Sequence, residues 1–270
     1  MFDLHALEAA LARTIFAGRL HFSPVTQSTN TDALEAARAA APHGSVYFAD
    51  EQLAGRGRGN HSWHSAAGQG LYVSILLRPT FPAERLRLLP LAAGLAAHHA
   101  IAESSGLKVD LRWPNDLLIG PRKVGGILVE ASINPSGLPH AVVGIGINVH
   151  QREFRSDLAT PASSLDLETR SRVSRQALLI ELLKSLERET LGLHDPAVAS
   201  TILRRVRQAS TWIASRRVQV HGPQACTGIT EGLDENGFLL VRTATGLVTV
   251  QTGGLRDAED QPSQQSNQEI

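Results

Sequence analysis

The segment Glu51-Gln52-Leu53-Ala54-Gly55-Arg56-Gly57-Arg58-Gly59-Asn60 places three alternate glycines and two interleaved arginines in one short stretch. Apolar, β-prone runs precede it at 45–49 (SVYFA) and follow it at 70–77 (GLYVSILL), so we expect a loop between two strands. Glycines let backbone N–H groups approach a ligand, and arginines offer planar forks to anions. The segment predicts a loop that binds phosphate or carboxylate, although a flexible solvated loop explains its composition equally well.

This loop matches neither common nucleotide-binding fingerprint. The chain has no G-x-x-x-x-G-K-[ST] motif, and Asn60 stands where a G-x-G-x-x-G motif needs its third glycine. The sequence also lacks an H-E-x-x-H metal motif and a G-x-S-x-G nucleophile elbow, and its single cysteine, Cys226, falls in an expected strand. We therefore expect no protein-bound metal ion and no covalent enzyme intermediate.

A second informative segment is Arg112-Trp113-Pro114-Asn115-Asp116, which continues into RKVGGILVE at 122–130. The turn leaves Asn115 and Asp116 free to meet a metal-bound phosphate, although an Asn-Asp pair after proline is more often simply a turn. The two glycines after Lys123 allow a ligand to approach the strand closely. Lys123 is one of three lysines in a chain that otherwise uses arginine, which marks it as a candidate for a compact ammonium. Chance is the alternative explanation.

Periodicity along the rest of the chain predicts an α+β fold. We expect helices at 3–17, 32–41, 84–103, 173–191 and 196–210, with the third interrupted or started late by Pro90. We expect strands at 45–49, 70–77, 108–113, 126–131 and 140–147. The last of these contains a third glycine-rich segment, GIGIN at 144–148, which either admits a ligand or packs against neighbouring backbone. Short strands at 216–221, 225–231, 237–243 and 246–251 predict a small appended β-barrel.

These elements divide the chain into three parts. Residues 1–214 form the large domain, with a core at about 18–210, residues 215–256 form the barrel, and the polar residues 257–270 are expected to be disordered. The formal net charge of zero argues against a protein that coats nucleic acid. No apolar run is long enough to span a membrane or to form a signal peptide, so we expect a cytoplasmic protein.

Four segments taken in order resemble the biotin protein ligase family. They are STN at 28–30, EQLAGRGRGN-x-x-W at 51–63, RWPNDLL…RKVGGILVE at 112–130 and GIGINV at 144–149. The resemblance covers about residues 20–255 and implies a mixed β-sheet catalytic domain with an SH3-like C-terminal barrel. It also implies that biotin reacts with Mg-ATP to give biotinyl-5′-AMP, from which a lysine of the biotin carboxyl carrier domain of acetyl-CoA carboxylase takes the biotin. Biotin and Mg-ATP are then substrates, and no cofactor is bound permanently.

The same resemblance implies roles for individual residues. Lys123 and Arg58 are implied to be catalytic. The implied biotin-binding residues are Ser28, Thr29, Asn30, Gln52, Arg56, Gly57, Arg58, Lys123 and Gly125. The implied ATP-binding residues are Arg58, Trp63, Asn115, Asp116, Asn148 and Arg256, with the Mg²⁺ of ATP near Asp116. Two departures from the family pattern affect these roles: Gly59-Asn60 replaces a further Arg-Gly pair, and the spacing before Arg256 is shorter.

Two other functions compete with this interpretation. A lipoate or octanoate ligase would share the scaffold, but the WPND and GRGR segments and the barrel argue against it. A biotin-sensing repressor would need a winged helix-turn-helix before the STN segment, where this sequence has 27 residues. We therefore expect a monofunctional ligase that binds a carrier protein, no DNA and no membrane. A homodimer is left open, because dimer contacts differ among family members.

Overall fold

The computed structural model describes residues 2–133 and 139–258. Within these ranges seven strands form one sheet in the order β1-β2-β3-β7-β6-β5-β4. The strands are β1 (Leu20–Thr26), β2 (Ser45–Gln52), β3 (Gly70–Leu77), β4 (Asp110–Arg112), β5 (Asp116–Ile119), β6 (Arg122–Ile133) and β7 (Pro139–Asn148). β1 pairs with β2 in parallel, and the remaining neighbours pair antiparallel. The sheet is mixed, which confirms the predicted α+β class.

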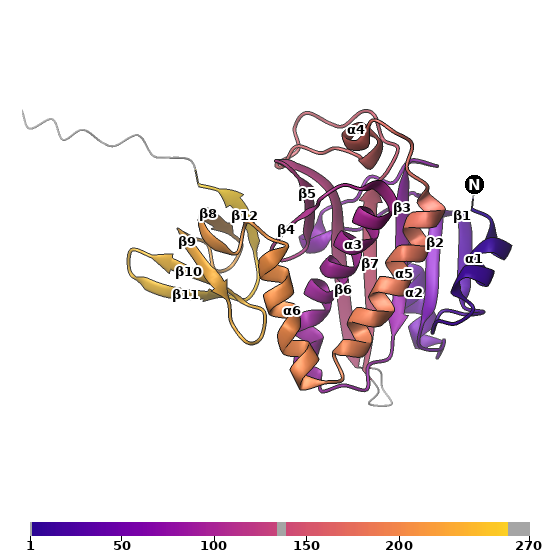
Figure 1. Ribbon diagram of the computed structural model, residues 1–270, viewed down its shortest axis with the longest axis horizontal. Helices are drawn as coiled ribbons and strands as arrows, with labels where there is room; N and C mark the ends of the chain where they lie inside the picture. Colours follow the sequence, from indigo (N-terminus) through magenta and orange to yellow (C-terminus); the bar gives the residue numbers. More distant parts are fainter. Residues whose placement is uncertain (1, 134–138, 259–270) are drawn as a thin grey trace, which may run out of the picture.

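Helices cover the two faces of this sheet unequally. The helices are α1 (Leu4–Leu11), α2 (Thr29–Arg38), α3 (Leu89–Ser105), α4 (Leu165–Thr169), α5 (Arg175–Gly192) and α6 (Pro196–Gln208). α3 and α5 pack together over the face that buries Val73, Ile75 and Val143, and α6 lies beside them (Figure 1). α2 packs on the opposite face, against Leu76 and Val142. Successive residues of a strand point to opposite faces, so one strand supplies both cores. None of the described helices combines the length and the apolar character needed to cross a membrane.

Two helix boundaries differ from the sequence-based expectation. α1 ends at Leu11 rather than near residue 17, because the chain then turns to bury Phe16 completely and passes Gly18 at a φ of 68°. α2 begins at Thr29 rather than at residue 32, with Ser28 in the extended backbone conformation of an N-cap. The first turn of α2 therefore contains Thr29 and Asn30, both buried under the sheet.

The C-terminal part is a second, all-β unit. Its strands are β8 (Ala214–His221), β9 (Cys226–Leu233), β10 (Leu239–Thr243), β11 (Gly246–Val250) and β12 (Gly254–Asp257). They form a five-stranded antiparallel sheet in the order β11-β10-β9-β8-β12.

Four of these strands were expected, and the fifth, β12, was missed. Its sequence Gly-Leu-Arg-Asp is four residues long and has one apolar residue, so it carries no alternation to recognise. Asp257 consequently belongs to a strand and not to the predicted disordered tail. Residues 259–270 of that tail lie outside the described residues.

Candidate functional site

A cavity that opens to solvent lies on the α2 face of the large sheet, with about 460 Å³ of empty space that includes part of the open solvent. It joins segments that are far apart in the sequence. Its lining consists of Ser28, Thr29, Asn30, Gln52, Arg56, Gly57, Arg58, Trp63, Tyr72, Val73, Asn115, Lys123, Gly126, Ile127, Leu128, Gly144, Ile145 and Gly146. The STN turn, the arginine-glycine loop, Lys123 and the GIGIN strand thus meet at one place.

Three glycines form the floor of this cavity. A Cβ atom at Gly144 would lie 1.9 Å from Asn30 Oδ1, and one at Gly146 would lie 2.6 Å from Trp63 Nε1. A Cβ atom at Gly126 would approach the Trp63 ring to 3.3 Å. Asn30 and Trp63 therefore rest directly on the strands. The GIGIN strand is closely packed, here against side chains that line the cavity, and the approach of a ligand to it remains a prediction.

A buried hydrogen-bond network holds the STN turn. Thr29 donates to Gln52 Oε1 through its backbone N (2.9 Å) and through Oγ1 (3.1 Å). Ser74 Oγ donates to Asn30 Oδ1 (2.5 Å) and also lies 2.8 Å from Thr29 Oγ1. Asn30 Nδ2 donates to Glu130 Oε2 (2.9 Å). The side chains are thereby oriented before any ligand arrives, which favours selective binding.

Sequence reasoning missed two members of this network, Ser74 and Glu130. Ser74 is the single serine in the otherwise apolar and aromatic run at 70–76, on the face that also carries Tyr72, and that anomaly was a usable signal. Glu130 ends the RKVGGILVE motif, where a carboxylate on a cavity-facing strand likewise had no assigned role. Neither could be paired with Asn30 from spacing alone, since 44 and 100 residues separate them from it.

Both loop arginines bind other parts of the protein. Arg56 Nη2 forms an ion pair with Glu130 Oε1 at 2.5 Å. Arg58 donates through Nη1 to the carbonyl of Gly253 and through Nη2 to Thr252 Oγ1, each at 2.5 Å. Burial lowers the pKa of Arg58, and the nearby carboxylate of Asp116 opposes this shift. The loop is therefore attached to the sheet at one arginine and to the C-terminal unit at the other.

Lys123 is held by a carboxylate that two cations share. Its Nζ lies 2.5 Å from Asp116 Oδ1, while Arg112 Nη2 lies 2.6 Å from Asp116 Oδ2. Burial raises the pKa of Asp116, but Lys123 and Arg112 outweigh it and hold that pKa below its usual value. Lys123 Nζ also lies 5.5 Å from the Trp63 ring centroid, within cation–π range.

The turn at 113–116 therefore does not leave its two polar side chains free, contrary to the sequence-based expectation. Asp116 is engaged by Lys123 and Arg112, and Asn115 Nδ2 donates to the carbonyl of Ile127 at 2.8 Å. Strand pairing explains both contacts, because Asp116 lies opposite Arg112 in the β4–β5 register.

Asp116 and three further predicted residues do not line the cavity. Gly125 points to the other face of β6, where a Cβ atom would lie 2.7 Å from Leu117 Cδ1. Asn148 is buried, and its Nδ2 donates to the carbonyl of Ser163 at 3.0 Å. Arg256 lies on β12, opposite Gln219 of β8. The predicted roles of these four residues in ligand binding remain predictions.

Comparison with known proteins agrees with this arrangement. Residues 22–148 match the biotin/lipoate A/B protein ligase family, and residues 216–253 match the biotin protein ligase C terminal domain. The biotin--[acetyl-CoA-carboxylase] ligase of Mycobacterium tuberculosis is 33% identical over 236 residues, which cover 84% of this chain and 85% of that protein. The chain belongs to the biotin protein ligase family. The resemblance seen in the four sequence motifs is thereby confirmed.

Two other members of the biotin protein ligase family show how much of the chain is similar to known proteins. The structure of the biotin protein ligase from Aquifex aeolicus in complex with biotin and ATP superposes with a TM-score of 0.77 at 30% identity, covering 89% of this chain and 100% of that one. The bifunctional ligase/repressor BirA of Bacillus subtilis is 35% identical over 180 residues, 66% of this chain. The match spans 55% of BirA, so the chain corresponds to about half the length of that relative.

Proposed function

We propose that this chain activates biotin with Mg-ATP and transfers it to a lysine of the biotin carboxyl carrier domain of acetyl-CoA carboxylase. One observation carries the proposal: a single cavity unites the STN turn, Gln52, the two loop arginines and Lys123. The Aquifex relative, which was solved with biotin and ATP, supports these substrates. The name of the Mycobacterium relative supports the acceptor.

The STN end of the cavity suits the head group of biotin. A ureido group presents both N–H donors and a carbonyl acceptor, and the side chains of Thr29 and Asn30, which line the cavity, offer both kinds of partner. The missing side chain at Gly144 lets Asn30 lie directly against β7 and take its place in the cavity lining. Beside it, Leu128 contributes apolar lining for the rings and the aliphatic chain.

Lys123 suits the end of the cavity where the carboxylate of biotin would meet ATP. A carboxylate oxygen of biotin attacks the α-phosphorus of ATP, the new O–P bond forms, and pyrophosphate leaves. Negative charge grows on the phosphoryl oxygens during this step, and an ammonium already fixed by Asp116 stabilises it without reorganisation. Trp63 offers a flat face for adenine. In the second step the carrier lysine attacks the acyl carbon and AMP leaves.

One incubation tests the proposed function. The protein is mixed with biotin, Mg-ATP and an apo biotinyl domain, and the mass of the domain is measured. We expect the addition of one biotinyl group that depends on ATP, and no addition when lipoate replaces biotin. Lipoyl transfer without biotinyl transfer would favour the lipoate ligase, and an unchanged domain mass in every reaction would contradict both enzymes.

Gly144→Ala should weaken biotin binding by about tenfold or more. The added Cβ would overlap Asn30 Oδ1, so Asn30 must move and lose its bonds to Ser74 and Glu130, and small-to-large changes in tight sites typically cost 1–3 kcal/mol. Isothermal titration with biotin measures the effect. Gly94→Ala is the matched control, because its added Cβ meets its nearest neighbours at an ordinary 3.7 Å. Equal biotin affinity in the two variants would contradict this use of Gly144.

Biotin and Mg-ATP together should protect residues 54–62 from proteolysis. This loop has no large apolar side chain to anchor it, and its described side-chain contacts to the rest of the protein are one ion pair of Arg56 and two hydrogen bonds of Arg58. Anionic ligands add charge-assisted bonds that offset the entropy of ordering the loop. Limited trypsin digestion followed by mass spectrometry should show slower cleavage at 54–62 with both ligands. A rate that the ligands leave unchanged would argue against loop ordering.

A further inference from the structure

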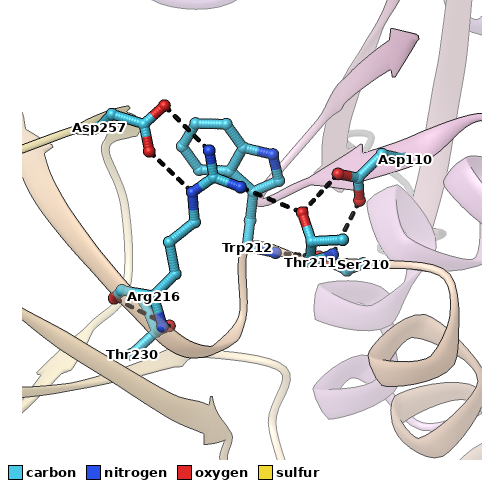
Figure 2. Close-up of polar contacts among 7 residues, drawn as sticks. All are labelled: Asp110, Ser210, Thr211, Trp212, Arg216, Thr230 and Asp257. Atoms are coloured by element: carbon cyan, nitrogen blue, oxygen red, sulfur yellow. Dashed lines mark hydrogen bonds and ion pairs between the residues drawn. The ribbon is translucent and has the colours of Figure 1, made fainter. Parts of the chain in front are cut away.

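The segment that connects the two parts of the chain runs along β4, the strand that leads into the turn at 113–116. We call residues 209–213, between α6 and β8, the junction segment. Leu111 N donates to the carbonyl of Ala209 at 2.9 Å, and Ser210 Oγ donates to the carbonyl of Leu111 at 2.5 Å. Asp110 accepts from Thr211 N at 2.8 Å and from Thr211 Oγ1 at 2.6 Å (Figure 2). The junction segment therefore fixes β4 residue by residue.

Trp212 of the junction segment stacks with a cation from each part of the chain. Trp212 is 4% exposed. The guanidinium carbon of Arg112 lies 5.2 Å from the centroid of its ring, and the guanidinium carbon of Arg216 lies 3.7 Å from that centroid. Arg216 is held in turn by Asp257, whose two carboxylate oxygens accept from Nε and Nη2 at 2.7 and 2.9 Å (Figure 2). Arg216 Nη1 also donates to Thr211 Oγ1 at 3.1 Å. Strands β8 and β12 thus fix the ring.

Arg112 connects this ring to Lys123. It is 7% exposed, and its guanidinium binds one oxygen of Asp116, while Lys123 binds the other. The planar guanidinium of arginine can stack on the indole while its edge donates to the carboxylate. If Arg112 turns, the carboxylate of Asp116 turns with it, and the position of the Lys123 ammonium changes.

The cost of this arrangement argues that it does more than fill space. Two guanidinium groups over one indole repel each other, and the buried charge of Arg112 is stable only when it is paired, whereas Arg216 pairs with an exposed carboxylate. Asp116 and Asp257 supply those pairs, one at each end of the chain of contacts. Apolar side chains would join the two sheets without bringing four charged residues together.

We propose that Trp212, Arg216 and Asp257 are positioning residues for Lys123, acting through Arg112 and Asp116. The C-terminal sheet then contributes to biotin activation without touching the substrates. This inference rests on the proposed function, in that Lys123 lies at the reacting centre. It assigns to the junction a role in the chemical step and none in substrate binding, because the STN network on β3 and β6 shares no residue with it.

Acetylation of Lys123 tests the proposal without any substrate. The chain has three lysines, so brief treatment with acetic anhydride and peptide mass spectrometry compares Lys123 with Lys108 and Lys184 in one sample. Trp212→Leu should raise the relative acetylation rate of Lys123 roughly fivefold to tenfold, because the ammonium loses its fixed partner. Trp212→Phe retains an aromatic face and should restore most of the original rate. In Trp212→Leu the kcat of adenylate formation should fall roughly tenfold, and the KM for biotin should stay unchanged.

A second variant guards against loss of folding in Trp212→Leu. Asp257→Asn alters a carboxylate whose side chain is 63% exposed, and it should release Arg216 and produce both effects in smaller measure. Glu231→Gln is the matched control, because it breaks the exposed Arg242–Glu231 pair of the same sheet and should leave both measurements unchanged. Unchanged Lys123 acetylation in both junction variants overturns the proposal, even if kcat falls. Absence of adenylation by the unaltered protein overturns the proposed function instead, and the acetylation rates still decide whether the junction positions Lys123.

Discussion

Lys123→Ala is expected to slow formation of biotinyl-5′-AMP by about 100-fold or more while the protein stays folded. The substitution removes an ammonium that Asp116 holds in place at 2.5 Å, beside the indole of Trp63. Losing one preorganised donor from a reacting centre typically adds ~3–4 kcal/mol to the barrier. At 1.36 kcal/mol for each factor of ten, that increase corresponds to a rate loss of about 100-fold or more. Exchange of labelled pyrophosphate into ATP in the presence of biotin measures the step.

Two further variants separate chemistry from stability in this experiment. Lys184→Ala removes an exposed lysine that lies 3.8 Å from Glu181 on the helix surface, and its exchange rate should match that of the unaltered protein. Lys123→Ala leaves Asp116 paired with Arg112 and should keep the melting temperature, whereas a combined Lys123→Ala and Asp116→Asn variant leaves buried Arg112 without this carboxylate and should lower the melting temperature. Near-normal pyrophosphate exchange by folded Lys123→Ala would remove Lys123 from the catalytic role.

The motif residues of this protein were predictable because local sequence determines where they lie. Alternation along β7 puts Gly144 and Gly146 on one face and Ile145 and Ile147 on the other, so the GIGIN pattern alone indicates a strand with a bare face. Ser28 precedes an expected helix, and the structure places it at the N-cap position. These features depend on neighbours within a few residues, which is the range over which propensity and periodicity are informative.

The partners of those residues were not predictable, because they come from distant parts of the chain. Arg56 pairs with Glu130 across 74 residues, and Arg58 donates to Gly253 across 195. No periodicity carries such information, and the alternative of a flexible solvated loop stayed open for that reason. The freedom expected for Asp116 failed for the same reason, since Arg112 and Lys123 reach it through the pairing of three strands. The sequence indicated residues that gather at the site, and tertiary packing determined the hydrogen-bond and ion-pair partner of each one.

Arg58→Gly is expected to leave adenylate formation active but to release biotinyl-5′-AMP early. The adenylate is a mixed anhydride that reacts with water and with exposed lysines, so the enzyme must enclose it until the carrier docks. Arg58 lines the cavity and ties the loop to the C-terminal unit through Gly253 and Thr252. Each hydrogen bond from a charged group contributes about 1.5–3 kcal/mol, so losing this side chain should reduce retention roughly 10- to 100-fold.

A mixed labelling assay measures this containment. The variant is incubated with biotin, Mg-ATP, an apo biotinyl domain and serum albumin, and the ratio of biotin on the carrier to biotin on albumin should fall. Thr252→Val removes one acceptor of Arg58 without altering the loop, so it should lower the ratio by a smaller amount if loop closure onto the C-terminal unit retains the adenylate. Arg155→Gly, which alters an arginine that is 79% exposed in its side chain, should leave the ratio unchanged. If Arg58→Gly also keeps the original ratio, Arg58 is a surface charge, and enclosure of the adenylate must come from another part of the protein.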